Sequence, residues 1–139
     1  MVLTTANSQT LFYQNLYAVM PLLNEEKNEE QKSLALRWYQ VRNTVKEQFG
    51  ERPDLNAMLF IIGMNEVGIV KEKWEKEEKQ DLMHVAICRL LSTEGYYKLL
   101  GNDDDGWPVY EALKEVPKIH LKEQDELLKR KIIEYFEAL

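Results

Sequence analysis

The strongest chemical signal in the sequence is a histidine and a cysteine four positions apart. His84 and Cys88 would project from the same side of a helix, one turn from each other. Asp81 adds a carboxylate before the histidine, and carboxylate, imidazole and thiolate groups are common ligands of divalent metals. Asp81 and His84 are therefore the candidate metal ligands. A di-iron site in a helical bundle needs a second histidine motif and further carboxylates, and because Glu66 is the one extra candidate we expect no metal and no other cofactor.

The same residues could also perform nucleophilic catalysis, with Cys88 as the nucleophile and His84 or Glu66 as the base. No glycine-rich oxyanion loop stands near the cysteine. The neighbours of Cys88 are apolar, and an apolar environment raises the pKa of a thiol. In the simpler interpretation, His84 lies in or at the edge of the core and forms a hydrogen bond with Glu66 or Asn65. Cys88 then packs as a small apolar residue, and we favour a function other than catalysis.

Four aromatic residues surround an acidic run in the segment from 96 to 110. Tyrosine and tryptophan are enriched at interfaces, and functional residues gather in loops. The alternative is that Trp107 and Tyr110 hold this segment against the rest of the fold. The candidate binding residues of the segment are Tyr96, Tyr97, Asp103, Asp105, Trp107 and Tyr110.

The acidic run, 103–105 followed by Gly106, also invites comparison with calcium-binding loops. An EF-hand loop has glycine at its sixth position and oxygen ligands, usually carboxylates, at its first and twelfth. With Gly106 at the sixth position, Gly101 and Ala112 would take the other two, so the EF-hand pattern fails. An incidental ion site remains open, although such a run is more often a solvated loop.

Length, charge and cysteine content exclude several classes of protein. A chain of 139 residues can bury a core without structural metals, and its single cysteine cannot form an internal disulfide. A net charge of −6 disfavours binding to nucleic acid or to an anionic membrane surface. The longest apolar stretch, 55–70, is interrupted by polar residues and is too short to span a membrane. No basic residue precedes Lys27, so we expect no secretory signal and a cytoplasmic location.

Apolar residues recur every three or four positions along most of the chain, which predicts helices. Asn28 and Asp54 are the expected N-caps, and Gly50 is the expected end of the second helix. The expected helices cover about 8–23, 28–49, 55–67, 80–92 and 121–139, with a short helix over 107–113.

Two of these helices, 55–67 and 80–92, are apolar on nearly every side, so they should lie together in the core. Gly63 and Gly68 indicate a close approach of two backbones or a helix end. The outer helices should each bury one apolar stripe. The stripes are Leu34, Trp38, Val41, Val45 and Phe49 in the second helix, and Leu121, Leu128, Ile132, Tyr135 and Leu139 in the last.

These patterns predict an all-α, single-domain bundle over residues 1–139, with four to five main helices, mostly antiparallel, and an irregular loop around 93–118. For function we expect a small cytoplasmic protein–protein interaction module that binds a protein partner or forms a homodimer. The aromatic residues would make the contact, and the aspartate run would steer a basic partner. The alternative is a small-ligand or metal-binding enzyme with its site between the third and fourth helices, at His84, Glu66 and Cys88.

Overall fold

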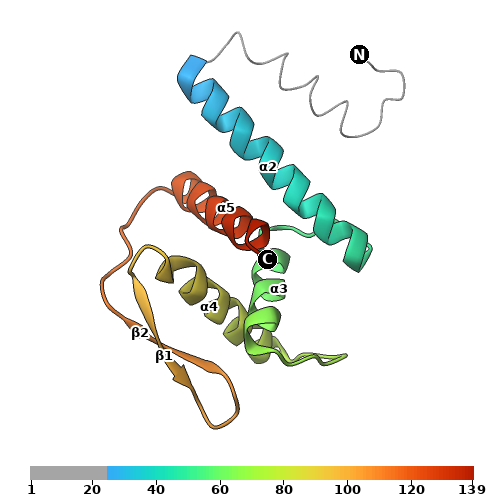
Figure 1. Ribbon diagram of the computed structural model, residues 1–139, viewed down its shortest axis with the longest axis vertical. Helices are drawn as coiled ribbons and strands as arrows, with labels where there is room; N and C mark the ends of the chain where they lie inside the picture. The colour runs from blue at the N-terminus through green and yellow to red at the C-terminus, as the bar shows by residue number, and fades with distance from the viewer. Residues whose placement is uncertain (1–24) are drawn as a thin grey trace. The chain divides into compact units, whose positions relative to one another are not determined.

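A computed structural model of the chain describes residues 25–139, so the helix expected over 8–23 lies outside the described part (Figure 1). The described residues are mostly helical, and they add one two-stranded antiparallel sheet. None of their helices has the length and apolar character needed to cross a membrane. The elements are α2 (Glu25–Phe49), α3 (Leu55–Val67), α4 (Lys76–Ser92), β1 (Tyr97–Asn102), β2 (Pro108–Ala112) and α5 (Leu121–Glu137).

The chain divides into two compact units between Tyr39 and Gln40, a boundary that falls within α2. Of the first unit, the structure describes residues 25–39, in which Trp38 is buried as its place in the apolar stripe predicts. All later elements belong to the second unit. That the whole chain is one domain stays a prediction.

Helix α2 ends where the sequence predicts but begins earlier. Gly50 has a positive φ of 88°, and its N–H donates to the carbonyl of Lys46 at 2.7 Å, which closes the last turn. At the other end the helix starts at Glu25, so Asn28 is not the N-cap, and residues 25–27, which lie between the two expected helices, are helical. Glutamate and lysine favour helix, which explains the extra turn. The stripe also ends early, because the side chain of Phe49 is 57% exposed.

Helix α3 has both of the boundaries that its capping residues predict. A carboxylate oxygen of Asp54 accepts a hydrogen bond from the N–H of Ala57 at 2.8 Å, and Gly68 ends the helix in the left-handed conformation. Met58 and Ile62 are fully buried. Ile61, however, is only half-buried, so this helix is not covered on all sides as we expected.

The backbones of α3 and α4 touch at Gly63. A Cβ atom at this position would lie 2.1 Å from the carbonyl oxygen of Leu82, far inside van der Waals contact. Leu82 and Ala86 of α4 are fully buried beside it, and Val85 is 6% exposed. The two helices have the most extensive helix–helix contact among the described elements, so they form the predicted core pair.

Helix α5 packs on this pair through its second half. Ile132 and Ile133 are fully buried, whereas Leu121 and Leu139 are 83% and 76% exposed, so the predicted stripe fails at both ends. Lys131 is also buried, and its ammonium group forms ion pairs with Glu94 and Glu134. Burial lowers the pKa of Lys131, but the two carboxylates outweigh it and hold the pKa above its usual value.

The described chain is mostly helical, as expected, but the segment expected to be an irregular loop with a short helix over 107–113 forms a β-hairpin instead. Strands β1 and β2 pair antiparallel, with Tyr97 opposite Ala112 and Leu99 opposite Tyr110, and a bulge interrupts β1 between Leu99 and Gly101. A carboxylate oxygen of Asp103 accepts hydrogen bonds from two backbone N–H groups of the turn, each at 2.9 Å. This aspartate turn, flanked by β-branched and aromatic residues, favours a hairpin over a helix.

We expect Gly63→Ala to destabilise the protein by about 1–3 kcal/mol, because the new methyl group overlaps the backbone of α4. Helix propensity alone predicts the opposite sign, a gain of about 1 kcal/mol. Urea unfolding measures the difference. Asn56→Ala, at an exposed position of the same helix, should change the free energy of unfolding by less than about 0.5 kcal/mol. A Gly63→Ala protein more stable than the parent would contradict the close approach.

Candidate interaction surface

Exposed large apolar side chains concentrate on the β-hairpin and the residues that follow it. Of the nine such side chains among the described residues, five fall between 99 and 116. We call these five the hairpin surface. They are Leu99, Leu100, Val109, Leu113 and Val116, with exposed fractions of 53%, 57%, 40%, 52% and 38%. Monomeric proteins seldom gather this much exposed apolar surface in one element unless it makes contact with something.

The two strands of the hairpin leave their outer edges without strand partners. The sheet of the described chain has two strands, so each strand pairs on one side alone. Leu99 and Leu100 lie at the bulge of β1, and both are more than half exposed. An edge strand with apolar side chains can accept a further strand from another chain.

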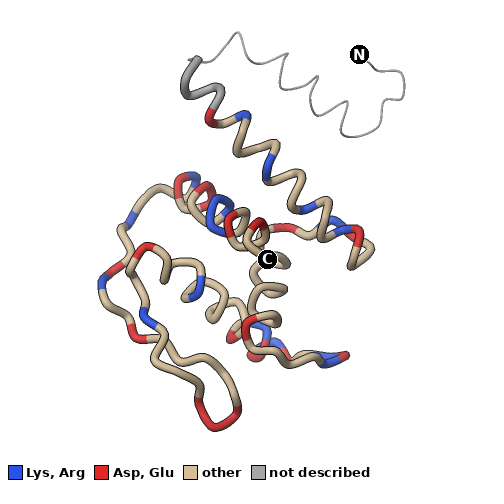
Figure 2. The backbone as a smooth tube through the Cα atoms, viewed as in Figure 1, with Lys and Arg blue, Asp and Glu red and all other residues tan. Residues whose placement is uncertain are grey.

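Charge is distributed unevenly along the hairpin. Figure 2 shows the acidic residues at its tip, where Asp103, Asp104 and Asp105 are all exposed. Towards the base the charges are mixed, with Lys98 opposite Glu111 and with Lys114 just beyond β2. The ammonium group of Lys114 lies 4.4 Å from the ring centre of Tyr96. The hairpin is thus negative at one end and carries a lysine at the other.

The aromatic residues of this segment are more buried than a contact surface requires. Tyr96, Tyr97, Trp107 and Tyr110 are all half-buried. The pKa of Tyr110 is raised, first because its side chain is partly buried and second because the carboxylate of Glu66 on α3 is nearby. These positions support the alternative that the aromatic rings hold the segment against the fold. The aliphatic side chains, which sequence reasoning did not single out, provide most of the exposed apolar surface.

The aspartates of the tip have different roles. Asp103 is a turn residue, because one of its carboxylate oxygens accepts hydrogen bonds from the backbone N–H groups of Asp105 and Trp107. The side chains of Asp104 and Asp105 are exposed. Within residues 25–139, no three histidine, cysteine, aspartate or glutamate residues are grouped so that they could hold a metal ion. Neither the tip nor the pair Asp81 and His84 therefore forms a complete ligand set in the described part.

The catalytic candidates do not form a single site. The sulfur of Cys88 lies 3.6 Å from Nε2 of His84, as their spacing predicts. Cys88 is 2% exposed, and burial raises the pKa of its thiol, which disfavours a nucleophilic thiolate. His84 is exposed instead of lying in or at the edge of the core. Glu66 contacts neither of these two residues, so the expected hydrogen bond between His84 and Glu66 is wrong.

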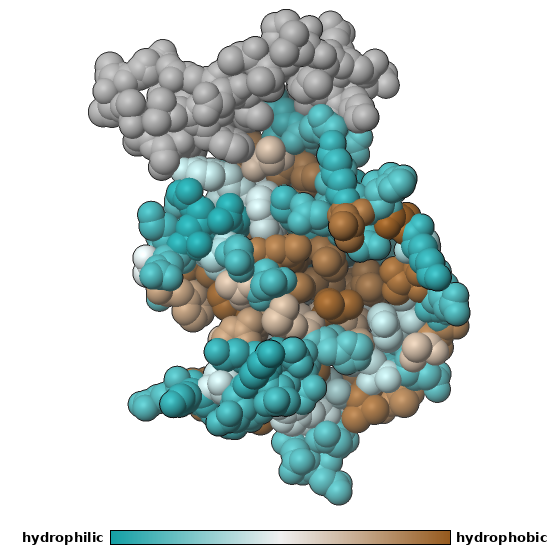
Figure 3. Space-filling model, turned by 180° about the vertical axis from the view of Figure 1, so that it is seen from behind, coloured by the Kyte–Doolittle hydropathy of each residue, from teal (hydrophilic) through white to brown (hydrophobic). Residues whose placement is uncertain are grey.

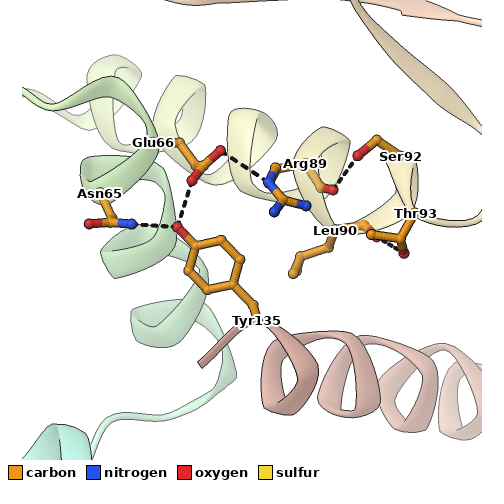
Figure 4. Close-up of polar contacts among 7 residues, drawn as sticks. All are labelled: Asn65, Glu66, Arg89, Leu90, Ser92, Thr93 and Tyr135. Carbon is orange, nitrogen blue, oxygen red and sulfur yellow. Dashed lines mark hydrogen bonds and ion pairs between the residues drawn. The ribbon is translucent and has the colours of Figure 1, made fainter. Parts of the chain in front are cut away.

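Glu66 belongs to a polar cluster that joins three helices (Figure 4). The hydroxyl of Tyr135 on α5 donates to Glu66 on α3 at 2.6 Å and accepts from the side-chain amide of Asn65 at 2.5 Å. Arg89 on α4 pairs with the other oxygen of Glu66 at 3.2 Å. Burial and the hydrogen bond to Glu66 raise the pKa of Tyr135 to about 12. The phenol is therefore neutral at physiological pH, and the cluster links the three helices.

A second apolar feature is a half-open groove between the end of α2, α3 and the end of α5. Its volume is about 390 Å³, and its apolar lining includes Phe49, Ile61 and Phe136. In Figure 3 brown, apolar side chains reach the surface in a band across the middle of the face shown and near the hairpin. The lining contains no aspartate, glutamate or histidine side chain, but it includes Tyr135, whose hydroxyl is held by Glu66 and Asn65. It shares no residue with the hairpin surface.

We expect Tyr135→Phe to lower the free energy of unfolding by about 1–3 kcal/mol, because Glu66 and Asn65 both lose a hydrogen-bond partner. Denaturant unfolding at neutral pH measures this loss. Tyr97→Phe, at a half-buried tyrosine of the hairpin, is the matched control and should change stability by less than about 0.5 kcal/mol. Equal effects of the two substitutions would contradict the fastening role of the cluster.

The raised pKa of Tyr135 predicts how this loss depends on pH. The pKa is about 12 in the folded protein and about 10 in an unfolded chain, so the stabilising contribution is complete below pH 10 and disappears as the pH rises through 12. The stability difference between the parent and Tyr135→Phe should therefore be constant from pH 7 to about 10 and then shrink. Unfolding titrations at stepped pH values measure it. A difference that already shrinks near pH 8 would contradict the assignment.

Comparison of the chain with protein-family models, with curated proteins and with solved structures gave no match in any of the three. The function must therefore be inferred from the surface that the chain itself presents.

Proposed function

We propose that this chain is a protein–protein interaction module that binds its partner through the β-hairpin. The observation that carries this proposal is the hairpin surface, five half-exposed aliphatic side chains on and beside a sheet whose outer edges have no strand partner within residues 25–139. Exposed apolar patches of this kind are typical of contact sites. An acidic tip beside them is suited to a partner with basic groups, because complementary charge speeds association and orients the two proteins.

The energetics favour a contact that combines apolar burial with main-chain hydrogen bonds. Complete burial of five half-exposed aliphatic side chains contributes about 4–7 kcal/mol. Association costs about 4–15 kcal/mol in lost translational and rotational freedom, so the hairpin surface alone does not produce tight binding. A strand added to the edge of the hairpin supplies further hydrogen bonds while its side chains cover the aliphatic patch. We therefore propose strand addition as the mode of binding.

The enzyme alternative has less support. It needs His84, Cys88 and Glu66 to act together, and Glu66 is held by Tyr135 and Arg89 instead. The remaining pair, His84 and Cys88, joins an exposed imidazole to a buried thiol whose pKa is raised. These observations favour a binding role over a catalytic one.

The double variant Leu99→Asp with Leu113→Asp tests the proposal, since it places charge in the middle of the hairpin surface. We expect an immobilised double variant to retain at least about tenfold less partner from native lysate than the parent chain, because two buried apolar contacts are lost. Quantitative mass spectrometry of the retained proteins measures this ratio, and circular dichroism checks that the variant is folded.

Leu121→Asp is the matched control, because Leu121 is 83% exposed at the start of α5 and lies outside the hairpin surface. It should retain the same proteins as the parent chain. If the folded double variant also retains all of them, the hairpin is not the contact site and the proposal fails.

A further inference from the structure

We infer that this chain forms a two-fold dimer in which residues 8–23 of each copy lie as a helix in the apolar groove of the other copy. The groove is the one between the end of α2, α3 and the end of α5, so the inference concerns a different surface from the proposed function. Its basis is the composition of the groove, the composition of residues 1–24 and the length of α2.

The groove combines an uncharged lining with apolar side chains that stay open to solvent. None of the side chains that line it is charged. Outside the hairpin surface, the described residues expose four large apolar side chains, and three of them line this groove. These three are Phe49, Val70 and Leu139, of which Val70 is 93% exposed. A charged group buried here would find no partner of opposite charge in the lining, so the groove is suited to an apolar, uncharged segment.

Residues 1–24 have this composition. The first charged side chain of the sequence is that of Glu25, so the whole stretch before α2 is uncharged. Its apolar residues recur at the helical positions i, i+4, i+7 and i+11, which are Phe12, Leu16, Val19 and Leu23. A helix with anchors at this spacing binds a partner by laying its apolar face in a hydrophobic groove. The segment and the groove thus match in chemical character.

The length of α2 selects a second copy as the source of the helix. The segment is joined to α2 at Glu25, whereas the groove includes Gln48 and Phe49, in the last turn of α2. A helix of 25 residues is about 37 Å long. A helix over 8–23 is about 24 Å long, so even if it turned back along its own α2 it would stop about 13 Å short of Phe49. A second copy can present its groove to the segment without this restriction.

Exchange of the two helices uses one kind of contact twice. In a two-fold dimer each copy gives its segment and receives the segment of the other, so both grooves are filled by the same side chains. Exchange of an identical element between protomers is a low-cost route to a dimer. Pro21 stands near the junction with α2, and because it lacks an N–H and crowds the preceding turn, it disfavours one continuous helix through the junction. The sequence therefore favours a change of direction before α2, as the exchange requires.

Sedimentation equilibrium of the full chain over a range of concentrations tests the inference. We expect the parent chain to be dimeric. Val70→Asp should raise the dimer dissociation constant at least about tenfold, because each groove then holds a charge that the uncharged segment cannot pair. The double variant Phe12→Asp with Leu16→Asp should do the same from the other side of the contact. A monomeric parent chain, or a dimer that either of these variants leaves unchanged, overturns the inference.

Two matched controls place the same charge outside the contact. Gln14→Asp lies on the side of the predicted helix opposite the stripe, and Leu121→Asp lies at the exposed start of α5, outside the groove. Each should leave the dissociation constant within about threefold of the parent value. A control that disrupts the dimer as strongly as Val70→Asp overturns the assignment to the groove. Circular dichroism checks that every variant is folded.

The hairpin variant separates this inference from the proposed function. The folded chain with Leu99→Asp and Leu113→Asp should remain dimeric, whether or not it loses the proteins that the parent chain retains from lysate. A loss of the dimer in this folded variant places the contact between copies on the hairpin and overturns the exchange.

Crosslinking in a Cys88→Ala background distinguishes exchange from docking within one chain. One chain carries Leu16→Cys and a second carries Val70→Cys, and a short bismaleimide joins cysteines that lie close together. The mixture should give a covalent dimer with one chain of each kind, whereas Leu121→Cys in place of Val70→Cys should give much less. A single chain that carries both Leu16→Cys and Val70→Cys should also form covalent dimers. If that chain instead forms an internal crosslink at monomer size, the segment docks in its own chain and the exchange is overturned.

Discussion

The direct backbone contact between α3 and α4 at Gly63 is the constraint on which the rest of the second unit depends. The missing side chain lets Leu82 bring its own carbonyl group against α3, and this approach aligns the buried faces of both helices. Strand β1 packs beside α4, and α5 contacts both helices. Every element of the unit after α2 is therefore positioned, directly or through one neighbour, by a pair of helices that only a glycine allows to come so close.

The polar cluster around Glu66 complements this apolar contact. Apolar side chains tolerate small rotations, whereas the hydrogen bonds of Tyr135 have defined directions and link α5 to α3. Arg89 extends the link to α4 and also lies over the ring of Tyr135, with 5.4 Å between its guanidinium carbon and the ring centre. Packing brings the three helices together, and the cluster determines how they are turned against one another.

Local signals in the sequence predicted local structure well. Asp54, Gly50 and Gly68 act at the helix ends where their types predict, and Gly63 marks the close approach. The hairpin was missed because Pro108 is also common at the first position of a helix. The aspartate turn followed by glycine, with aromatic and aliphatic residues on both sides of it, was the signal that could have identified both strands.

The site was harder to predict than the fold. Tyr135 reaches Glu66 across 69 positions of sequence, and spacing within one helix carries no information about such a contact. The exposure of Leu99 and Leu113 depends in the same way on which elements the hairpin happens to pack against. The pairing of His84 with Cys88 was predictable because it lies within one helix, yet its environment, an exposed ring over a buried thiol, was not.

The bulge in β1 has a consequence for how the protein behaves at high concentration. A strand that exposes leucines along an open edge is a template for endless stacking of identical chains into fibrils. The extra residue between Leu99 and Gly101 bends β1 and breaks the regular spacing of its hydrogen-bonding groups. A stack growing on that side would lose its register at each layer. The irregular backbone of β1 is thus poorly suited to regular stacking of identical strands, although its leucines stay exposed.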